Sequence, residues 1–396
     1  MPLLDRQIGL RISQSGRVPM GTEQVPVRRC GHALVHRLLL DSHPEYVEAV
    51  RAAEAEPPDG PLDTAVESNE TLTIRTVVHV IHHTDDTQLV TDAQVHSQID
   101  ALNRDFQAQN GDIAAVPDPF KGVVGNSRIR FELAQIAPDG TVTNGITWRV
   151  QDQRQSFNIS DNAVKSTAAG GQDPWDTTRY MNIWVCNLEV YLGHATGPGT
   201  PASVDGVVIR GTAFGNTGIA EAPYNMGRTG THEVGHYLNL KHIFGDLETT
   251  CDSPDGVNDT PRQMEANQGR PSFPKPSQCG EPNGDMFMNF MDYVFDDTML
   301  MFTKGQAARM RRCVKRKRSG LLVDSPMLLA GPTMGAPIRH QQLSAEALYQ
   351  YRTRLEEHYL LLAHHYEALR ERGQLDARGA QAYAQVRSVY DDLRRR

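Results

Sequence analysis

The chain has 396 residues, with 40 lysines and arginines against 48 aspartates and glutamates, and a formal charge of -8. This length allows a sizeable core and more than one folding unit, and the acidic balance argues against nucleic-acid binding as the main role. No apolar run approaches the length of a membrane span, and the N-terminus lacks the pattern of a signal peptide. Five cysteines exclude a disulfide-rich scaffold but allow one bridge, which would favour an oxidising compartment.

The elements predicted in chain order indicate an α/β protein. A helical stretch over 32–55 and a linker at 56–61 are followed by a strand at 73–82, where β-branched residues alternate. The remaining elements are a helix over 92–107, strands at 129–134, 181–186 and 206–209, and a helix over 229–239. This order suggests an upper subdomain with a twisted mixed sheet and a long helix, and an irregular lower subdomain.

One segment carries His-Glu-x-x-His and a third histidine six residues later. On a helix, His232 and His236 face the same side and can hold one metal ion, while Glu233 stays near enough to take a proton from a water at the metal. His242 reaches the same ion only if the chain bends sharply, and Asn239 is the natural place because Asn tolerates the left-handed conformation. Three neutral imidazoles with one open position predict a catalytic zinc site.

His-Glu-x-x-His alone also occurs by chance on surface helices, but the third histidine is an independent match to the metzincin spacing. Over about residues 28–318 the sequence resembles the pappalysin family of metzincin metallopeptidases. The resemblance rests on separated motifs: Arg29-Cys30-Gly31, Leu102–Phe106, Asn182–Cys186, Leu192–Ala195, the zinc helix, Asp259-Thr260-Pro261, Asn289–Tyr293 and Phe302–Gln306. It implies that His232, His236 and His242 bind zinc and that Glu233 is the general base. Asn239 departs from the glycine usual there.

Further roles are implied by the resemblance. Met291 matches the Met-turn beneath the zinc, although a methionine-rich core is the plain alternative. Tyr293 would hydrogen-bond the oxyanion of a tetrahedral intermediate or play a structural part. Leu192 and Gly193 lie in a segment similar to the upper-rim edge strand that pairs with an extended substrate; an ordinary edge strand is the alternative.

Cys30 is expected to be a cysteine switch. Its thiolate could occupy the fourth zinc position, and the neighbouring Arg28 and Arg29 would favour that thiolate; a free surface thiol is the alternative. The resemblance also implies that Asp297 selects Arg, and then Lys, on the carboxyl side of the cut, because family members with an acidic residue at the matching place favour Arg there. A carboxylate at the base of a pocket would pair with a guanidinium in a bidentate fashion. Asp296 is the neighbouring alternative, and a surface Asp pair is the plain one.

Two features of the lower subdomain are also implied by the resemblance. Cys251 and Cys279 match one disulfide of the family, whereas the positions of a second are taken by Arg270 and Thr298, so Cys186 and Cys313 should remain free thiols. An oxygen-rich loop includes two calcium candidates, although a solvated acidic loop is the alternative. The candidates are Asp255 and Thr260.

The chain divides into a propeptide-like segment (1–60), a metzincin catalytic domain (61–325), a linker (326–341) and a helical hairpin (342–396). The hairpin could bind a helical partner or associate with itself. The sequence therefore predicts a secreted zinc endopeptidase made as a latent zymogen and acting on proteins or peptides. The alternative is a catalytically silent zinc-binding or partner-binding protein that acts through its C-terminal helices.

Overall fold

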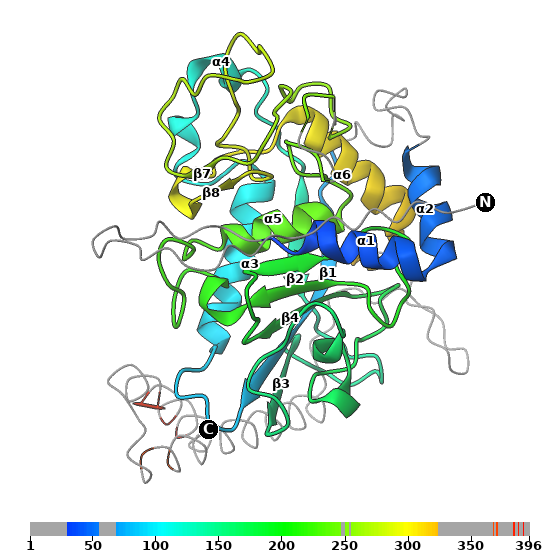
Figure 1. Ribbon diagram of the computed structural model, residues 1–396. Coiled ribbons are helices and arrows are strands. Elements are labelled where there is room, and N and C mark those ends of the chain that lie inside the picture. Colours follow the sequence, from blue (N-terminus) through cyan, green and yellow to red (C-terminus); the bar gives the residue numbers. More distant parts are fainter. Residues whose placement is uncertain are drawn as a thin grey trace, which may run out of the picture.

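The computed structural model describes residues 30–54, 69–246, 250–252 and 255–323, together with six single positions between 367 and 391. A six-stranded sheet forms the centre of the fold (Figure 1). Its strands are β1 (Leu72–His83), β2 (Ile129–Leu133), β3 (Ile146–Gln151), β4 (Met181–Cys186), β5 (Gly193–Ala195) and β6 (Val207–Arg210). The order is β2-β1-β4-β6-β5, and β3 pairs with the second half of β1. All pairings are parallel except that of β5 with β6, which leaves β5 as an antiparallel edge.

Both faces of the sheet are covered, and the strand side chains alternate between them. Ile183 and Val185 of β4 pack into the larger core, whereas Trp184 and Cys186 pack into a second cluster on the opposite face. A strand that is buried on both faces has no need of polar residues at every second position, and Asn182 is the one polar residue of β4. The strands expected at 73–82, 129–134, 181–186 and 206–209 are confirmed within one residue at each end.

Helices α3 (Asp92–Phe106) and α5 (Arg228–Tyr237) pack against one face of the sheet and against each other. The Thr91 hydroxyl accepts a hydrogen bond from Gln94 N and caps α3. A Cβ at Gly230 of α5 would lie 2.4 Å from Gln98 Nε2 of α3, so only glycine permits this approach. The helix expected over 229–239 is confirmed, and the close contact with α3 fixes it beneath β5.

The helical stretch expected over 32–55 is two helices, and the prediction of one was wrong. α1 (His32–Ser42) ends at His43, which is extended because a residue before proline avoids the helical region, and α2 (Pro44–Glu54) begins at Pro44. Val35, Leu39 and Tyr46 bury their side chains in the cluster that contains Trp184. These two helices therefore pack onto the catalytic unit, with α1 beside α5 (Figure 1).

The part of the chain after α5 is largely irregular, as expected. It contains a two-stranded ribbon of β7 (Gln268–Gly269) and β8 (Tyr293–Val294), and the helix α6 (Lys304–Lys317), which begins with a capping box of Thr303 and Gln306. A single-turn helix, α4 (Asp118–Lys121), precedes β2. Short 3-10 helices occur at Ile113–Ala115, Ala163–Lys165, Thr167–Ala169, Gly211–Ala213, Asp296–Thr298 and Ser319–Leu321.

The predicted linker at 326–341 lies outside the described residues, as does the hairpin at 342–396 apart from the six single positions. Among these, the Tyr383 hydroxyl donates to the Glu367 carboxylate at 2.9 Å, and Arg387 donates to the same carboxylate at 3.2 Å. Within the described part of the chain, no helix is both long and apolar enough to cross a membrane.

Candidate metal centre and active site

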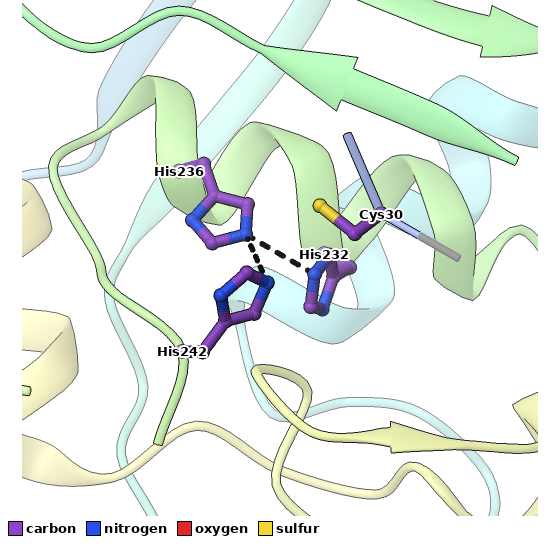
Figure 2. Close-up of side chains that lie close together, drawn as sticks. All are labelled: Cys30, His232, His236 and His242. Atoms are coloured by element: carbon purple, nitrogen blue, oxygen red, sulfur yellow. Dashed lines mark hydrogen bonds between the residues drawn. The ribbon is translucent and has the colours of Figure 1, made fainter. Parts of the chain in front are cut away.

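Three histidines and one cysteine converge beneath β5 (Figure 2). His232 and His236 stand on successive turns of α5, and His242 comes from the loop that follows. The Nε2 atom of His236 lies 3.1 Å from Nε2 of His232 and 3.1 Å from Nε2 of His242. The ligand atoms of all four residues, including Sγ of Cys30, lie within 4.8 Å of one another.

The hydrogen bonds of the three Nδ1 atoms determine whether the Nε2 atoms can bind a metal ion. Nδ1 of His232 lies 2.7 Å from the Phe290 carbonyl, and Nδ1 of His236 lies 2.8 Å from the Leu240 carbonyl. A carbonyl only accepts, so each Nδ1 carries the proton and each Nε2 presents a lone pair. Nδ1 of His242 lies 2.7 Å from the Asp246 carboxylate, with the same consequence.

Three lone pairs that point at one another repel, and a shared cation removes that repulsion. Tetrahedral zinc with Zn–N bonds of ~2.0–2.1 Å would separate its nitrogen ligands by about 3.3 Å, close to the distances in this cluster. Burial, followed by the nearby His32, also holds the pKa of His236 well below its usual value, so this ring is neutral as a ligand must be. The donor set therefore fits zinc.

The chain reverses at Asn239, which adopts the left-handed conformation with φ 76°. The bend predicted from the sequence is confirmed at this residue, and it brings His242 back beneath α5. Met291 lies under the same helix: a Cβ at Gly235 would be 2.6 Å from Met291 Sδ. The backbone N–H of Ile243 donates to the Met291 carbonyl at 3.2 Å, so the turn at Met291 supports both the helix and the ligand loop.

Glu233 is buried on the side of α5 that faces β5. A Cβ at Gly193 would lie 2.8 Å from Glu233 Cγ, so glycine at this position of the edge strand leaves room for the carboxylate. The Tyr293 hydroxyl is 3.0 Å from His242 Nε2 and therefore borders the metal position. Both residues therefore lie beside the three histidines.

Cys30 reaches this centre from the start of the described chain. Its thiol donates to the Glu233 carboxylate at 3.6 Å, and it forms a parallel bridge with Gly193, where Gly31 N donates to the Gly193 carbonyl at 2.9 Å. Burial, with the Glu233 carboxylate second, raises the pKa of the Cys30 thiol well above its usual value. A bound zinc ion would act in the opposite direction. Arg28 and Arg29, expected to favour the thiolate, lie outside the described residues.

Two residues at this centre had not been anticipated. The His32 ring stacks on the His236 ring, with centroids 3.9 Å apart and planes 9° apart, and its Nδ1 contacts the Ala195 carbonyl at 2.8 Å. Asp246 orients His242 as described above. Asp246 could have been suspected because it follows His242 by four residues in a loop, whereas nothing in the local sequence places His32 against α5.

Leu192 and Gly193 lie at the start of the edge strand. Leu192 packs with Tyr224 and Phe295, and its carbonyl accepts from Arg210 N at 2.8 Å. β5 has β6 on one side only, and its other edge is the one that Cys30 and Gly31 contact. The edge expected to receive a substrate is therefore occupied by the residues just before α1.

Asp297 lies on an exposed turn rather than at the closed base of a pocket. Its carboxylate is paired with Arg270 at 2.7 Å, and the guanidinium of Arg270 also lies over the Phe295 ring. Asp296, the alternative, is buried and accepts from the backbone N–H groups of Met226 and Arg228 at the start of α5. Of these two acids, only Asp297 has an exposed carboxylate.

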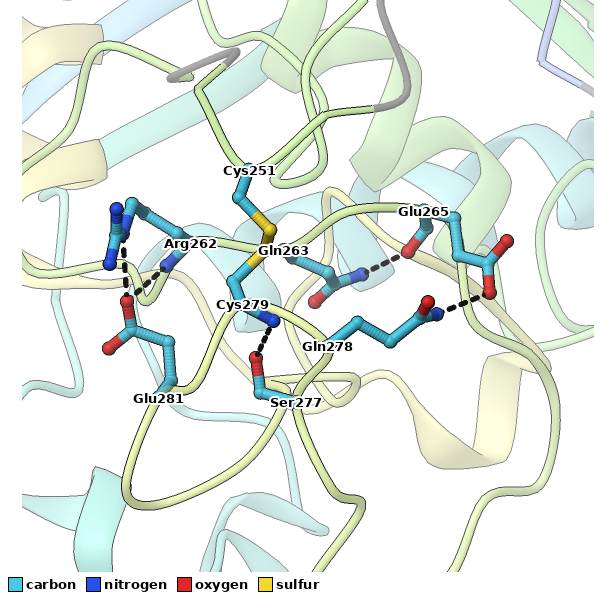
Figure 3. Close-up of a disulfide and its surroundings, with 8 residues drawn as sticks. All are labelled: Cys251, Arg262, Gln263, Glu265, Ser277, Gln278, Cys279 and Glu281. Atoms are coloured by element: carbon cyan, nitrogen blue, oxygen red, sulfur yellow. Dashed lines mark hydrogen bonds and ion pairs between the residues drawn. A yellow bond between two sulfur atoms is a disulfide. The ribbon is translucent and has the colours of Figure 1, made fainter.

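The predicted disulfide joins Cys251 and Cys279 (Figure 3). Cys186 and Cys313 are free and buried, as expected. Hydrogen bonds and an ion pair tie the loops around the bridge together: Arg262 with Glu281, Gln278 with Glu265, Gln263 with the Glu265 carbonyl, and Cys279 N with Ser277. The bridge thus stabilises a region that has little regular structure of its own.

The loop that carries the calcium candidates is internally bonded. The Asp255 carboxylate accepts from Val257 N at 3.0 Å and from the Thr260 hydroxyl at 2.9 Å. Burial raises the pKa of Asp255 to about 7. The cluster around His236 is the one group of three or more potential metal-binding side chains that the described residues contain.

The fold places a twisted sheet above a helix that carries two histidines and a glutamate, and a third histidine lies on the next loop. This arrangement defines a metalloendopeptidase of the metzincin type. The family model described as pregnancy-associated plasma protein-A matches residues 164–315. The chain belongs to this pappalysin family, and the family implies a catalytic zinc.

An extracellular metalloprotease of Arthroderma otae is 30% identical over 259 residues, which cover 63% of this chain and 80% of that protein. A promirolysin mutant of Tannerella forsythia is 39% identical, with a TM-score of 0.67 over 75% of this chain and 97% of that structure. Mature mirolysin of the same organism, in complex with a cleaved peptide, is 43% identical, with a TM-score of 0.61 over 65% of this chain and 97% of that one. Extracellular relatives and the disulfide confirm the expected extracellular location.

Proposed function

We propose that this metalloendopeptidase is a latent precursor in which His232, His236 and His242 hold zinc, Glu233 is the general base and Cys30 blocks the fourth zinc position. One observation carries the proposal: the Nε2 atoms of three histidines and the thiol sulfur of Cys30 gather within 4.8 Å of one another. A single zinc ion accepts the lone pairs of all three imidazoles and leaves a fourth position for the thiol.

The residues around the ion would each have a separate role in peptide hydrolysis. Bound zinc would polarise the scissile carbonyl and make a water acidic enough to attack it. Glu233 takes the proton of the attacking water and later delivers it to the leaving amine. Tyr293 donates its hydroxyl hydrogen to the oxygen on which negative charge develops. Once Cys30 and Gly31 have left it, the edge of β5 at Gly193 would hold an extended peptide through main-chain hydrogen bonds.

The precursor would be latent because Cys30 and Gly31 occupy the space that a substrate needs. Cys30 and Gly31 pair with Gly193, so they occupy the strand edge that a substrate needs, and the thiol contacts the general base. The match to promirolysin extends over more of this chain than the match to mature mirolysin, 75% against 65%, which supports a precursor form. Removal of the segment before β1 would expose both the edge and the metal.

Substrate preference is assigned to Asp297. Phe295, two residues earlier, packs with Leu192 at the start of the edge strand, so the Asp297 segment adjoins the cleft. An arginine or lysine on the carboxyl side of the cut would replace Arg270 as the partner of Asp297. Exchange of one guanidinium for another keeps the bidentate geometry, which favours arginine over lysine.

Two finer assignments complete the proposal. Calcium would bind near Asp255 and Thr260, because a second carboxylate of this loop, that of Asp259, has a buried oxygen without a hydrogen-bond partner. A rise in melting temperature on addition of calcium, lost in Asp259→Asn, would support this site. The C-terminal helices would bind a helical partner or a second copy of the chain, which light scattering with and without residues 342–396 can test.

The catalytic assignment is tested by Glu233→Ala. The variant should retain zinc and the fold but lose nearly all cleavage of a protein substrate, because only the base is removed. Glu221→Ala, at an exposed glutamate, is the matched control and should keep both zinc and activity. Zinc content, cleavage with and without a chelator, and mapping of the cut bonds are the measurements. Near-normal turnover by Glu233→Ala would contradict the assigned role and favour the silent zinc-binding alternative.

A further inference from the structure

A second cavity, of about 410 Å³, lies at the carboxyl ends of β1, β4 and β6. None of its lining residues is a metal ligand, the general base or part of the segment that blocks the metal. Its apolar walls are aliphatic: Ile81, Val90, Val185, Leu188 and Ile219. The crevice outside the carboxyl ends of parallel strands is where open α/β sheets bind small ligands, and this volume lies within the range of such sites.

Two polar side chains in the wall have buried atoms without partners. His82 at the end of β1 is 4% exposed, and its Nε2 has no hydrogen-bond partner. Its ring is fixed by stacking on Trp148, with its Nδ1 3.8 Å from the Asp86 carboxylate. A buried polar atom that is left unpaired costs free energy, so a ligand that pairs with it gains that free energy back.

Arg210 at the end of β6 is the second such residue. Its Nε is buried without a partner, and no carboxylate of the described residues lies within 4 Å of its guanidinium. Burial lowers the pKa of Arg210, yet an arginine stays charged at neutral pH. A half-buried guanidinium with a free Nε is a forked donor that matches the two oxygens of a carboxylate.

We propose that this cavity binds a small organic carboxylate with an aliphatic body of about the size of leucine. The carboxylate would take a forked hydrogen bond from Arg210 and a second bond from His82 in its Nε2–H form, and the aliphatic part would lie against Val90 and Ile219. Asp86 and Glu189 also line the cavity, so a doubly charged anion such as phosphate would be repelled. A free amino acid and a short fatty acid both have this chemistry.

The location gives such a ligand contact with the catalytic unit. The backbone N–H of Arg210 donates to the Leu192 carbonyl at 2.8 Å, immediately before the edge strand β5. The cavity is therefore one residue away from the rim of the cleft while remaining separate from it. The inference rests on the cavity and its unpaired atoms and does not depend on the proposed peptidase mechanism.

The test uses the full chain carrying Glu233→Ala, in which self-cleavage is prevented and the metal centre is covered by Cys30. Calorimetric titrations with 4-methylpentanoate, leucine, leucinamide and inorganic phosphate distinguish the ligand classes. 4-Methylpentanoate, leucine or both should bind at one site. The one that binds more tightly shows whether the ligand is a short fatty acid or a free amino acid. Leucinamide, which lacks the carboxylate, should bind at least about tenfold more weakly, and phosphate should not bind.

Arg210→Gln should weaken binding by about tenfold or more, whereas Arg130→Gln, at an exposed arginine of β2, should bind like the parent. Melting temperatures establish that each variant is folded. If Arg210→Gln does not fold, Ile219→Phe, which narrows the cavity without changing a charge, should lower the affinity instead. Absence of saturable binding by both carboxylates, equal binding of leucinamide, or unchanged affinity in the folded variant would show the assignment to be wrong.

Discussion

Replacement of Asp246 by asparagine tests how the third zinc ligand is held. His232 and His236 donate their Nδ1 protons to backbone carbonyls, which no side-chain substitution removes. His242 alone relies on a side chain: the same oxygen of Asp246 accepts from its Nδ1 at 2.7 Å and from its backbone N–H at 3.1 Å. The Asp246 side chain is 7% exposed, so water does not screen this pair.

The expected magnitude follows from these contacts. Burial alone would raise the pKa of Asp246, but its hydrogen bond and charge interaction with His242 lower it below its ordinary value. The carboxylate is thus ionised, and it fixes the orientation of the His242 ring. Loss of such a partner typically weakens metal affinity about 10- to 100-fold, or about 1.4 to 2.8 kcal/mol. Asparagine retains an acceptor oxygen, so Asp246→Ala should have the larger effect.

The assay is zinc transfer to a chromogenic chelator, followed in time, with turnover measured separately at saturating zinc. Asp246→Asn should release zinc faster and bind it more weakly, while turnover of the reloaded enzyme falls less. Asp173→Asn is the control, because Asp173 is exposed and accepts from Thr167 N in a surface loop. Zinc release from Asp246→Asn at the rate of the parent would refute the argument that this carboxylate holds the ligand.

Three further predictions follow. Cys30→Ala should give a precursor that is active, or that matures, sooner than the parent; a variant that is equally latent would contradict the cysteine switch. Asp297→Ala should flatten the preference for Arg and Lys in cleavage-site profiling. Arg270→Ala should lower KM for substrates with Arg at that position by about 1.4- to 5-fold, because an exposed ion pair worth ~0.2–1 kcal/mol no longer competes. An unchanged profile in both would rule out Asp297. Asn239→Ala should destabilise the protein by roughly 1–2 kcal/mol in urea unfolding, whereas Asn239→Gly should be close to neutral; equal stability of the two would mean that the left-handed turn is not the cause.

Local chemistry made several features predictable from the sequence. The bend at Asn239 followed from the need to return His242 to the helix, and the φ of 76° agrees. The alternating β-branched residues at 73–82 predicted β1, and the largely apolar run at 181–186 predicted β4. β3 was missed because Ile146–Gln151 mixes polar with apolar residues, so its pairing with β1 decides its conformation.

Contacts between distant segments could not be predicted in the same way. The pairing of Cys30 with Gly193, the stacking of His32 on His236 and the bond of Arg270 to Asp297 all depend on the tertiary arrangement. The sequence did not reveal that Arg270 pairs with the Asp297 carboxylate. Pro44 divides the stretch that was expected to be one helix over 32–55, and this division follows from a rule of local sequence.

The close spacing of the zinc ligands along the chain has a consequence for the order of folding. His232, His236 and His242 come from one helix and its adjoining turn, so bringing them together closes only a very short loop and costs little chain entropy. The thiol that covers them is 203 residues from Glu233, and its contact requires the whole sheet to be in place. The metal centre can therefore assemble before it is blocked. Opening it again requires only the detachment of α1 and α2, with no rearrangement of the ligands themselves.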